Sequence, residues 1–247
     1  MKKVFKFIAA GLAVAAFCIA AAGCGSAPTT AELYNNAVYD AMIADEDEIF
    51  PLVCLTEEDE RARFDEGGRT LLVSWHSYPE SYPEGQTVTL QWGEVWTFTL
   101  GEIADWYGDN ADSVTAWTLR LEQLIGLPEN DGKTHFTAFW VDLEDVVRPA
   151  YRTDPTADEM DNEFPDGYAQ NDPDEIAFKE WFDGNIIGSY YDSEYPWTRL
   201  GYTYDWSGDD DEYGLTEFLI LSGAETEVAF TDTTEEFLQR LEKECSE

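Results

Sequence analysis

The chain has only two histidines, His76 and His135, so both nucleophile–histidine catalysis and zinc binding depend on them. The sequence contains no G-x-S-x-G, HExxH, P-loop, GxGxxG or CxxC motif. A zinc site of His76, His135 and a carboxylate is conceivable, but structural zinc takes four ligands, and two ordinary structural histidines are the simpler interpretation. The sequence therefore assigns no catalytic residue, no metal ligand and no cofactor.

Carboxylates dominate the charge of the chain. There are 52 acidic and 14 basic residues among 247, which gives a formal net charge of −38. Paired carboxylates can hydrolyse glycosidic bonds, but among 52 acids close pairs arise by chance. A chain this acidic cannot neutralise phosphates, which excludes nucleic-acid binding. A solvated surface, adaptation to high salt, and weak binding of divalent cations or of a basic protein partner remain open.

One acidic loop, residues 205–212, carries oxygen ligands at alternating positions, as calcium loops do. It departs from the EF-hand pattern, because Asp210 replaces the turn glycine and Thr216 occupies the position of the closing glutamate. We expect a solvated turn, with weak calcium binding as the alternative.

Aromatic residues make up 15% of the chain and cluster in two stretches, 75–82 and 190–213. Aromatic faces stack on sugar rings, so exposed rings in these stretches would suit a carbohydrate ligand. The candidate ligand-binding residues are Trp75, Tyr78, Tyr82, Trp197 and Tyr202. The alternative is that these rings fill the core of a sheet, since aromatic residues are common in strands.

The N-terminal segment combines three lysines with an uncharged run of 17 residues, Phe7–Gly23. This run is short for a transmembrane helix, which needs about 20 residues. It ends in Ala21-Ala22-Gly23-Cys24 and resembles the lipobox of bacterial lipoproteins. The resemblance implies a signal peptide over residues 1–23, a palmitate-type lipid on Cys24, a tether over 24–30, and a position on the outer side of the cell membrane. An ordinary secretory signal or an uncleaved anchor is the alternative.

Two further cysteines, Cys54 and Cys245, follow Cys24. Outside the cytoplasm such a pair is often a disulfide, and here it would close a very long loop. In the chain-entropy model a loop of this kind adds about 4–5 kcal/mol of stability. Two buried free thiols are the alternative.

Helices and strands must position these groups. Capping-box patterns at Thr29 and Thr233 predict a first helix to about residue 44 and a final helix at the C-terminal end, and the same spacing at Thr99 predicts a short helix after it. Further helices are expected over residues 56–64, 99–107, 112–126 and 175–182. Strands are expected over residues 70–76, 86–92, 95–100, 135–141, 200–206, 215–221 and 226–230. The run 135–141 is largely apolar on both faces, as a central strand would be, and 215–221 is expected to pair with 200–206 across an acidic hairpin loop, 207–214. The strands 86–92 and 95–100 are expected to form a hairpin that pairs Trp92 with Trp96, and residues 154–174 an exposed acidic loop.

This order of elements predicts a single α+β domain over residues 31–247, with a largely antiparallel twisted sheet, flanking helices and long acidic loops. The stretches Trp75–Pro83, Trp92–Trp96 and Pro196–Tyr202 resemble acidic lipoproteins of Gram-positive gut anaerobes, a likeness that implies no activity. We expect a lipid-anchored extracytoplasmic protein that binds a ligand or partner. The alternatives are a carboxylate-dependent glycan hydrolase at the cell surface and a structural component of a surface assembly.

Overall fold

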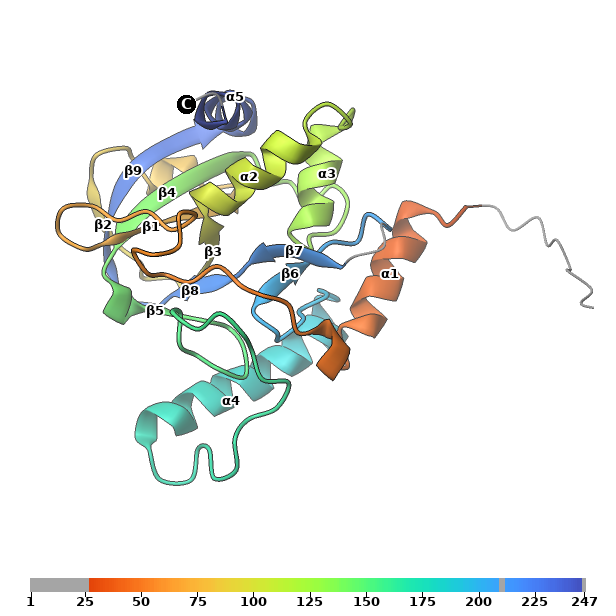
Figure 1. Cartoon of the computed structure of the whole chain (residues 1–247), viewed down its shortest axis with the longest axis vertical. Coiled ribbons are helices and arrows are strands. Elements are labelled where there is room, and N and C mark those ends of the chain that lie inside the picture. The colour runs from red at the N-terminus through yellow and green to blue at the C-terminus, as the bar shows by residue number, and fades with distance from the viewer. Residues whose placement is uncertain (1–26, 209–211, 246–247) are drawn as a thin grey trace, which may run out of the picture.

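A computed structural model describes residues 27–208 and 212–245 (Figure 1). The lipobox and Cys24 lie outside these ranges, so the signal peptide and the lipid anchor stay predictions. In the described part, no helix combines the length and the apolar character that crossing a membrane requires.

The large sheet has the strand order β2-β9-β4-β1-β3-β8-β5, and each neighbouring pair is antiparallel. At its centre, β1 (Thr70–His76) and β4 (His135–Val141) pair along their whole lengths. The other strands are β2 (Thr87–Thr89), β3 (Val95–Thr99), β5 (Val146–Val147), β8 (Phe218–Ile220) and β9 (Glu225–Thr233). The predicted central position of residues 135–141 is therefore confirmed.

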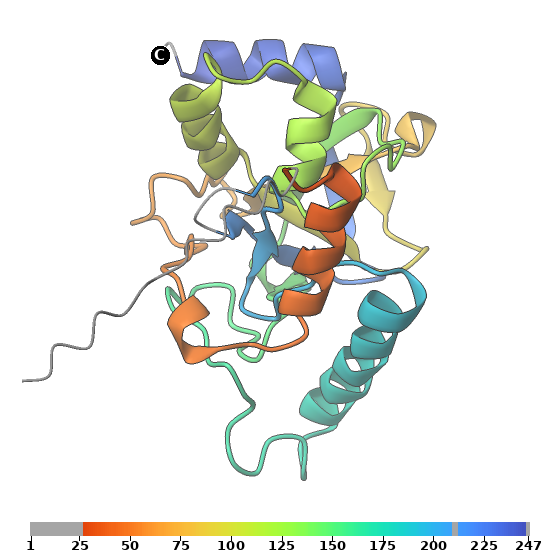
Figure 2. The ribbon, with the colours of Figure 1, turned by 90° about the vertical axis from the view of Figure 1, so that its right-hand side faces the viewer.

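Helices cover one face of this sheet, where α2 (Leu100–Asn110) and α5 (Thr234–Glu244) pack on each other above the strands (Figures 1 and 2). The Phe237 ring of α5 stacks on Phe136 of β4, with ring centroids 4.0 Å apart. A second core on the opposite face includes Leu55, Leu72 and Phe218. Both helices begin at the threonines that the capping patterns indicated, with backbone N–H groups donating to the threonine hydroxyls.

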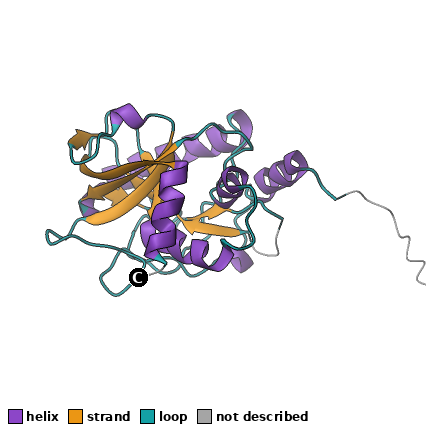
Figure 3. Ribbon diagram, turned by 90° about the horizontal axis from the view of Figure 1, so that it is seen from above, coloured by secondary structure: helices purple, strands orange, loops and turns teal. Residues whose placement is uncertain are grey.

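A smaller hairpin lies beside the large sheet and pairs β6 (Tyr202–Tyr204) with β7 (Tyr213–Thr216), which confirms the predicted hairpin. The helices near it are α1 (Thr30–Asp40), α3 (Trp117–Leu124) and α4 (Pro173–Ile187), which continues into a π-helical turn, Gly188–Asp192 (Figures 1 and 3). The whole forms one α+β domain, as predicted. Residues 215–221 do not form one strand, however, because the chain leaves β7 at Thr216 and enters β8 at Phe218. Glu217 is the single residue between the two sheets.

The predicted hairpin of residues 86–92 and 95–100 is wrong. β2 pairs with β9 at the edge of the sheet, whereas β3 lies between β1 and β8. The backbone of Leu90 exchanges hydrogen bonds with Gly223 and Ala224 next to β9, and Trp92 is left 99% exposed. The alternation of apolar residues set which face is buried, but it carried no information about which strand is the neighbour.

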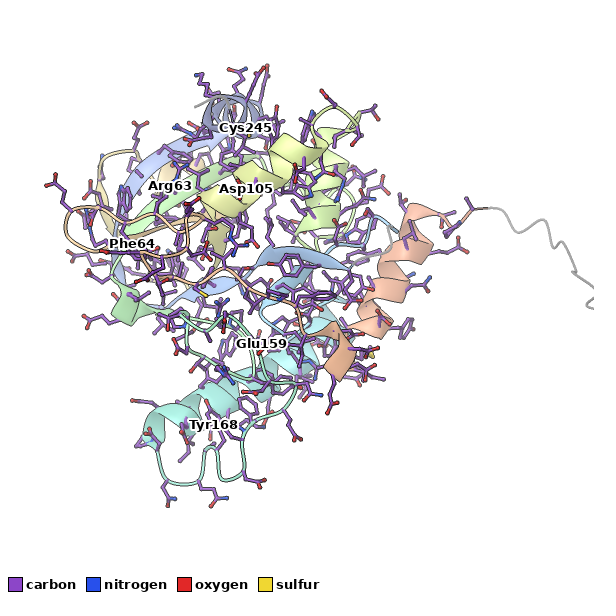
Figure 4. The ribbon with its side chains drawn as sticks, viewed as in Figure 1. Arg63, Phe64, Asp105, Glu159, Tyr168 and Cys245 are labelled. Carbon is purple, nitrogen blue, oxygen red and sulfur yellow. The ribbon has the colours of Figure 1, made fainter. Side chains whose placement is uncertain are left out.

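Two predicted helices also differ. Residues 56–64 form turns, because the Asp59 carboxylate accepts hydrogen bonds from the backbone of Cys54 and Arg61 and so competes with a helix. The helix expected from residue 112 begins only at Trp117. The acidic segment 154–172 is a loop, as expected, but Met160 is 3% exposed and anchors it in the core. Figure 4 shows a later residue of this loop, Tyr168, beside α4.

The predicted disulfide is not formed, because Cys54 and Cys245 are both free thiols. Cys245 ends α5 on the helical face of the sheet (Figure 4), and its Sγ lies 3.1 Å from the carbonyl oxygen of Ala104 in α2. The Sγ of Cys54 faces the carbonyl oxygen of Leu52, and the neighbouring Leu55 packs on the opposite face of the sheet. The two thiols therefore lie against different parts of the backbone, Cys245 against α2 and Cys54 against its own segment.

Candidate functional site

A cavity of about 500 Å³ opens where two neighbouring strands of the large sheet part. β1 and β3 pair only at Leu72–Thr99 and Val73–Phe98. Beyond these pairs the strands separate, and residues 74–76 of β1 and 95–98 of β3 line the cavity. Residues 125–127 after α3, the end of α4 with its π-helical turn, and β6 complete the wall. A volume of this size is in the range of small-molecule sites.

The wall is rich in aromatic rings. Three of the five predicted ligand-binding residues line it: Trp75, Tyr82 and Trp197. Four further rings join them: Trp96, Phe98, Tyr195 and Tyr204. The rings of Trp96 and Trp197 stand at 90° to each other with centroids 6.1 Å apart, so they pack edge to face and hold each other in place. The structure thus brings together aromatic residues from β1, β3, β6 and two loops.

The other two predicted residues are not part of this wall. Tyr78 is 70% exposed and lies outside the lining. Tyr202 is 0% exposed and belongs to a separate core cluster, where its hydroxyl donates to the carbonyl oxygen of Glu48 or to Oε1 of Glu212. The core interpretation of the aromatic residues therefore holds for Tyr202. It also holds in part for Trp75 and Trp197, which line the cavity but are 5% exposed and belong to core clusters.

Glu217 supplies the most unusual polar group of the cavity. Its backbone N–H donates to the carbonyl oxygen of Gly201 at 2.9 Å, which fixes the residue at the junction of the two sheets. Its side chain lines the cavity, and its Oε2 atom is buried with no hydrogen-bond partner among the described residues. Burial alone raises the pKa of Glu217 to about 8. A carboxyl group without a partner is costly to bury, so it is a candidate for a functional role.

Glu102 shows what a buried structural carboxyl looks like in the same fold. Its Oε1 accepts from the Tyr213 hydroxyl at 2.6 Å and from the Thr216 hydroxyl at 3.0 Å, and its Oε2 accepts from the Thr216 backbone at 2.8 Å. Burial raises the pKa of Glu102, and these hydrogen bonds act in the opposite direction. Both carboxyl oxygens of Glu102 therefore accept hydrogen bonds, whereas Oε2 of Glu217 accepts none among the described residues.

His76 lines the cavity but has no free ring nitrogen. Its Nδ1 accepts the backbone N–H of Tyr78 at 3.0 Å, so its Nε2 carries the proton and donates to the Thr137 hydroxyl at 2.7 Å. That hydroxyl lies 2.8 Å from Thr231, whose own hydroxyl donates to the carbonyl oxygen of Tyr82. Burial lowers the pKa of His76 to about 4, which keeps the ring neutral. This series of hydrogen bonds holds the segment around Tyr82 in place. It also leaves His76 without a free lone pair that could bind zinc.

Some of the nitrogen donors of the cavity already have partners. Asn185 donates from Nδ2 to the carbonyl oxygen of Trp181 at 3.1 Å. Lys133 forms an ion pair with Asp131 at 3.0 Å. The oxygen groups of the lining include the carboxyls of Glu94 and Glu217 and the serine hydroxyls. Within the described lining, Oε2 of Glu217 is the buried side-chain polar atom that lacks a hydrogen-bond partner.

The acidic loop with the calcium-like spacing is not assembled as a metal site in its described part. Asp205 makes a two-pronged ion pair with Arg120, at 3.0 and 2.6 Å, so its oxygens are occupied. Residues 209–211 lie outside the described ranges. Among the described residues, the carboxylates of Asp40, Glu48 and Glu212 have oxygen atoms within 4.8 Å of one another. Weak calcium binding stays a prediction.

Comparison of the chain with protein-family models, curated proteins and solved structures finds no match. The site must therefore be interpreted from its own geometry.

Sequence reasoning missed Glu217, although a signal was present. It is the one acid in the run Leu215–Leu221, whose other members are apolar or threonine. A lone carboxyl inside such a run is either a defect in the core or a functional group. Tyr195 and Tyr204 belonged to the aromatic stretch that was recognised, but only the folded loops show which rings face the cavity.

Proposed function

We propose that this protein is a lipid-anchored extracytoplasmic binding protein whose small-molecule ligand occupies the cavity between β1 and β3. The observation that carries the proposal is the buried, unpartnered carboxyl oxygen of Glu217 in a cavity walled by aromatic rings. Ligand sites combine apolar walls with a few well-placed polar groups, and this cavity has that composition. The lipobox pattern supports the extracytoplasmic position.

Filling the cavity is the direct test of this proposal. Ser189→Phe places a bulky ring in the lining, and Ser113→Phe makes the same change at an exposed position outside it. We expect members of a panel of monosaccharides, amino acids and organic amines to change the tryptophan fluorescence and melting temperature of the purified full chain. Ser189→Phe should weaken this binding at least tenfold and Ser113→Phe should not. If no compound binds, or if both variants bind as the wild type does, the proposal is wrong.

A second candidate function is the hydrolysis of glycosidic bonds, which the raised pKa of Glu217 favours because a general acid must hold its proton near neutral pH. The second carboxyl of the lining is Glu94, which is exposed at the mouth. Release of nitrophenol from nitrophenyl glycosides by the wild type, abolished in Glu217→Gln, would support this function. The aromatic rings of the lining favour binding.

The lipid anchor has its own test. Cys24→Ala removes the thiol that the lipobox pattern predicts to be acylated, so the protein should move from the membrane fraction to the soluble fraction of fractionated cells. A single acyl chain holds weakly and two or more hold stably, so the loss should be nearly complete. Unchanged membrane retention of Cys24→Ala would contradict the anchor and leave the binding proposal standing.

A further inference from the structure

We infer that the ligand of this cavity is an organic ammonium ion, held by the carboxylate of Glu217 and by the faces of the surrounding aromatic rings. This inference rests on the proposed binding function and names the chemical class of its ligand. It departs from the carbohydrate expected from the aromatic content alone.

The aromatic walls suit a cation with apolar substituents. Trp96 and Trp197 stand perpendicular to each other, and Tyr195 and Tyr204 add two further rings to the lining. The negative face of such rings attracts an alkylated ammonium ion, an interaction worth about 0.5–2 kcal/mol for each well-placed ring. Rings that several elements bring to one cavity can contact a compact cation from more than one side, whereas a flat sugar stacks on a single face.

The polar groups of the cavity also favour a cationic ligand. A sugar ring presents many hydroxyls and needs both donors and acceptors, whereas His76 uses its one ring N–H on Thr137, and Asn185 and Lys133 each already make a contact inside the protein. Among the buried polar atoms of the described lining, Oε2 of Glu217 is the one without a partner, and it is an acceptor when the carboxyl is ionised. A ligand that brings positive charge, and N–H donors where it has them, complements this arrangement. The formal net charge of −38 also attracts cations toward the surface.

The charge of the cavity changes at one group over the neutral range. Burial raises the pKa of Tyr82, Tyr190, Tyr195 and Tyr204, so these hydroxyls stay neutral, and it lowers the pKa of His76 to about 4. Lys133 is paired with Asp131 and Glu94 lies exposed at the mouth. Arg199 stacks on Tyr190 but donates to the Tyr151 hydroxyl and to the carbonyl oxygen of Ala41. Burial remains the sole cause of the raised pKa of Glu217.

Binding of a cation should therefore release a proton. Below about pH 8 the carboxyl of Glu217 is mostly protonated in the empty cavity, and a cation favours its ionised form. The affinity for a ligand of constant charge should then rise about tenfold for each pH unit up to about pH 8 and level off above it. An uncharged ligand of the same shape should show no such dependence.

Choline and its uncharged isostere 3,3-dimethylbutan-1-ol are the matched probes, because choline keeps its charge at every pH. Titration calorimetry of the purified full chain at pH 6, 7 and 9 should show choline binding that strengthens with pH and releases a proton. The isostere should bind at least tenfold more weakly at pH 9. Glu217→Gln should lose most of the choline affinity at pH 9, whereas Glu57→Gln, at an exposed position outside the lining, should not.

Several outcomes would overturn the inference. Equal binding of choline and its isostere, a flat pH profile, or an unchanged affinity in Glu217→Gln would each do so, as would the absence of choline binding. If methyl glucosides bind in a manner sensitive to Ser189→Phe while choline does not, the ligand class is wrong and the binding function stands. If no probe binds, both proposals fail.

Discussion

Glu217→Gln is expected to make the protein more stable than the wild type at alkaline pH, by up to roughly 4–5 kcal/mol if the whole pKa shift is realised. The amide keeps the shape of the carboxylic acid but cannot ionise. In the unfolded chain the carboxyl has an ordinary pKa near 4.5, and in the folded protein burial raises it to about 8. Below pH 4.5 the group is protonated in both states, so the two proteins should then be nearly equal in stability.

The direction in which the stability of the wild type changes with pH follows from proton binding. Between pH 4.5 and 8 the folded state holds a proton that the unfolded state has lost, so the stability of the wild type falls as pH rises through this window and stays low above it. Urea unfolding of both proteins at pH 4.5, 6, 7 and 9 measures the difference. Glu102→Gln is a useful comparison, since that carboxyl is also buried but has partners. A constant difference between wild type and Glu217→Gln over this range would show that water or a counter-charge reaches Glu217.

Arg148→Met is expected to destabilise the protein by about 3–5 kcal/mol at pH 7. The side chain is 0% exposed and makes no ion pair among the described residues. Its Nη2 instead donates to the carbonyl oxygens of Val53, Pro155 and Ala157, at 2.6, 3.2 and 2.7 Å, and its Nε donates to that of Asp154. The guanidinium carbon also lies 4.7 Å from the centroid of the Phe218 ring. Methionine fills a similar volume but leaves these carbonyls without a donor.

Arg148→Lys is the matched control. Lysine keeps the positive charge and can donate to some of the same carbonyls, so its cost should lie between those of the wild type and Arg148→Met. Guanidinium chloride unfolding at pH 7 gives both values. A cost below about 1 kcal/mol for Arg148→Met would mean that water replaces the guanidinium and that the segment 153–157 is held by other contacts.

Local signals in the sequence were sufficient for most elements of the fold. Thr29, Thr99 and Thr233 each accept the backbone N–H three residues later, so the residue pattern fixed where three helices begin. The continuous apolar run 135–141 likewise required burial on both faces, and it lies at the centre of the sheet. The predictions were wrong where a residue far away in the sequence determines which strand is the neighbour. β2 pairs with β9, whose residues come more than 130 positions later, and no local pattern encodes that choice.

The candidate site was less predictable for the same reason. Trp75, Tyr82 and Trp197 could be named as aromatic candidates, but the sequence could not distinguish them from Tyr202, which is equally aromatic and fully buried elsewhere. Whether a ring faces a cavity depends on how β1 and β3 part. The importance of Glu217 depends on the lack of a partner, which is a property of the assembled fold and not of the residue type.

The single-residue link between β7 and β8 also restricts how this chain can change over evolutionary time. Side chains alternate between the faces of a strand, so inserting or deleting one residue at this link would turn Phe218 and Ile220 away from their core. Length changes are tolerated in surface loops, where no such alternation must be kept. Descendants of this sequence can therefore replace the residue at position 217 far more easily than they can alter the number of residues around it.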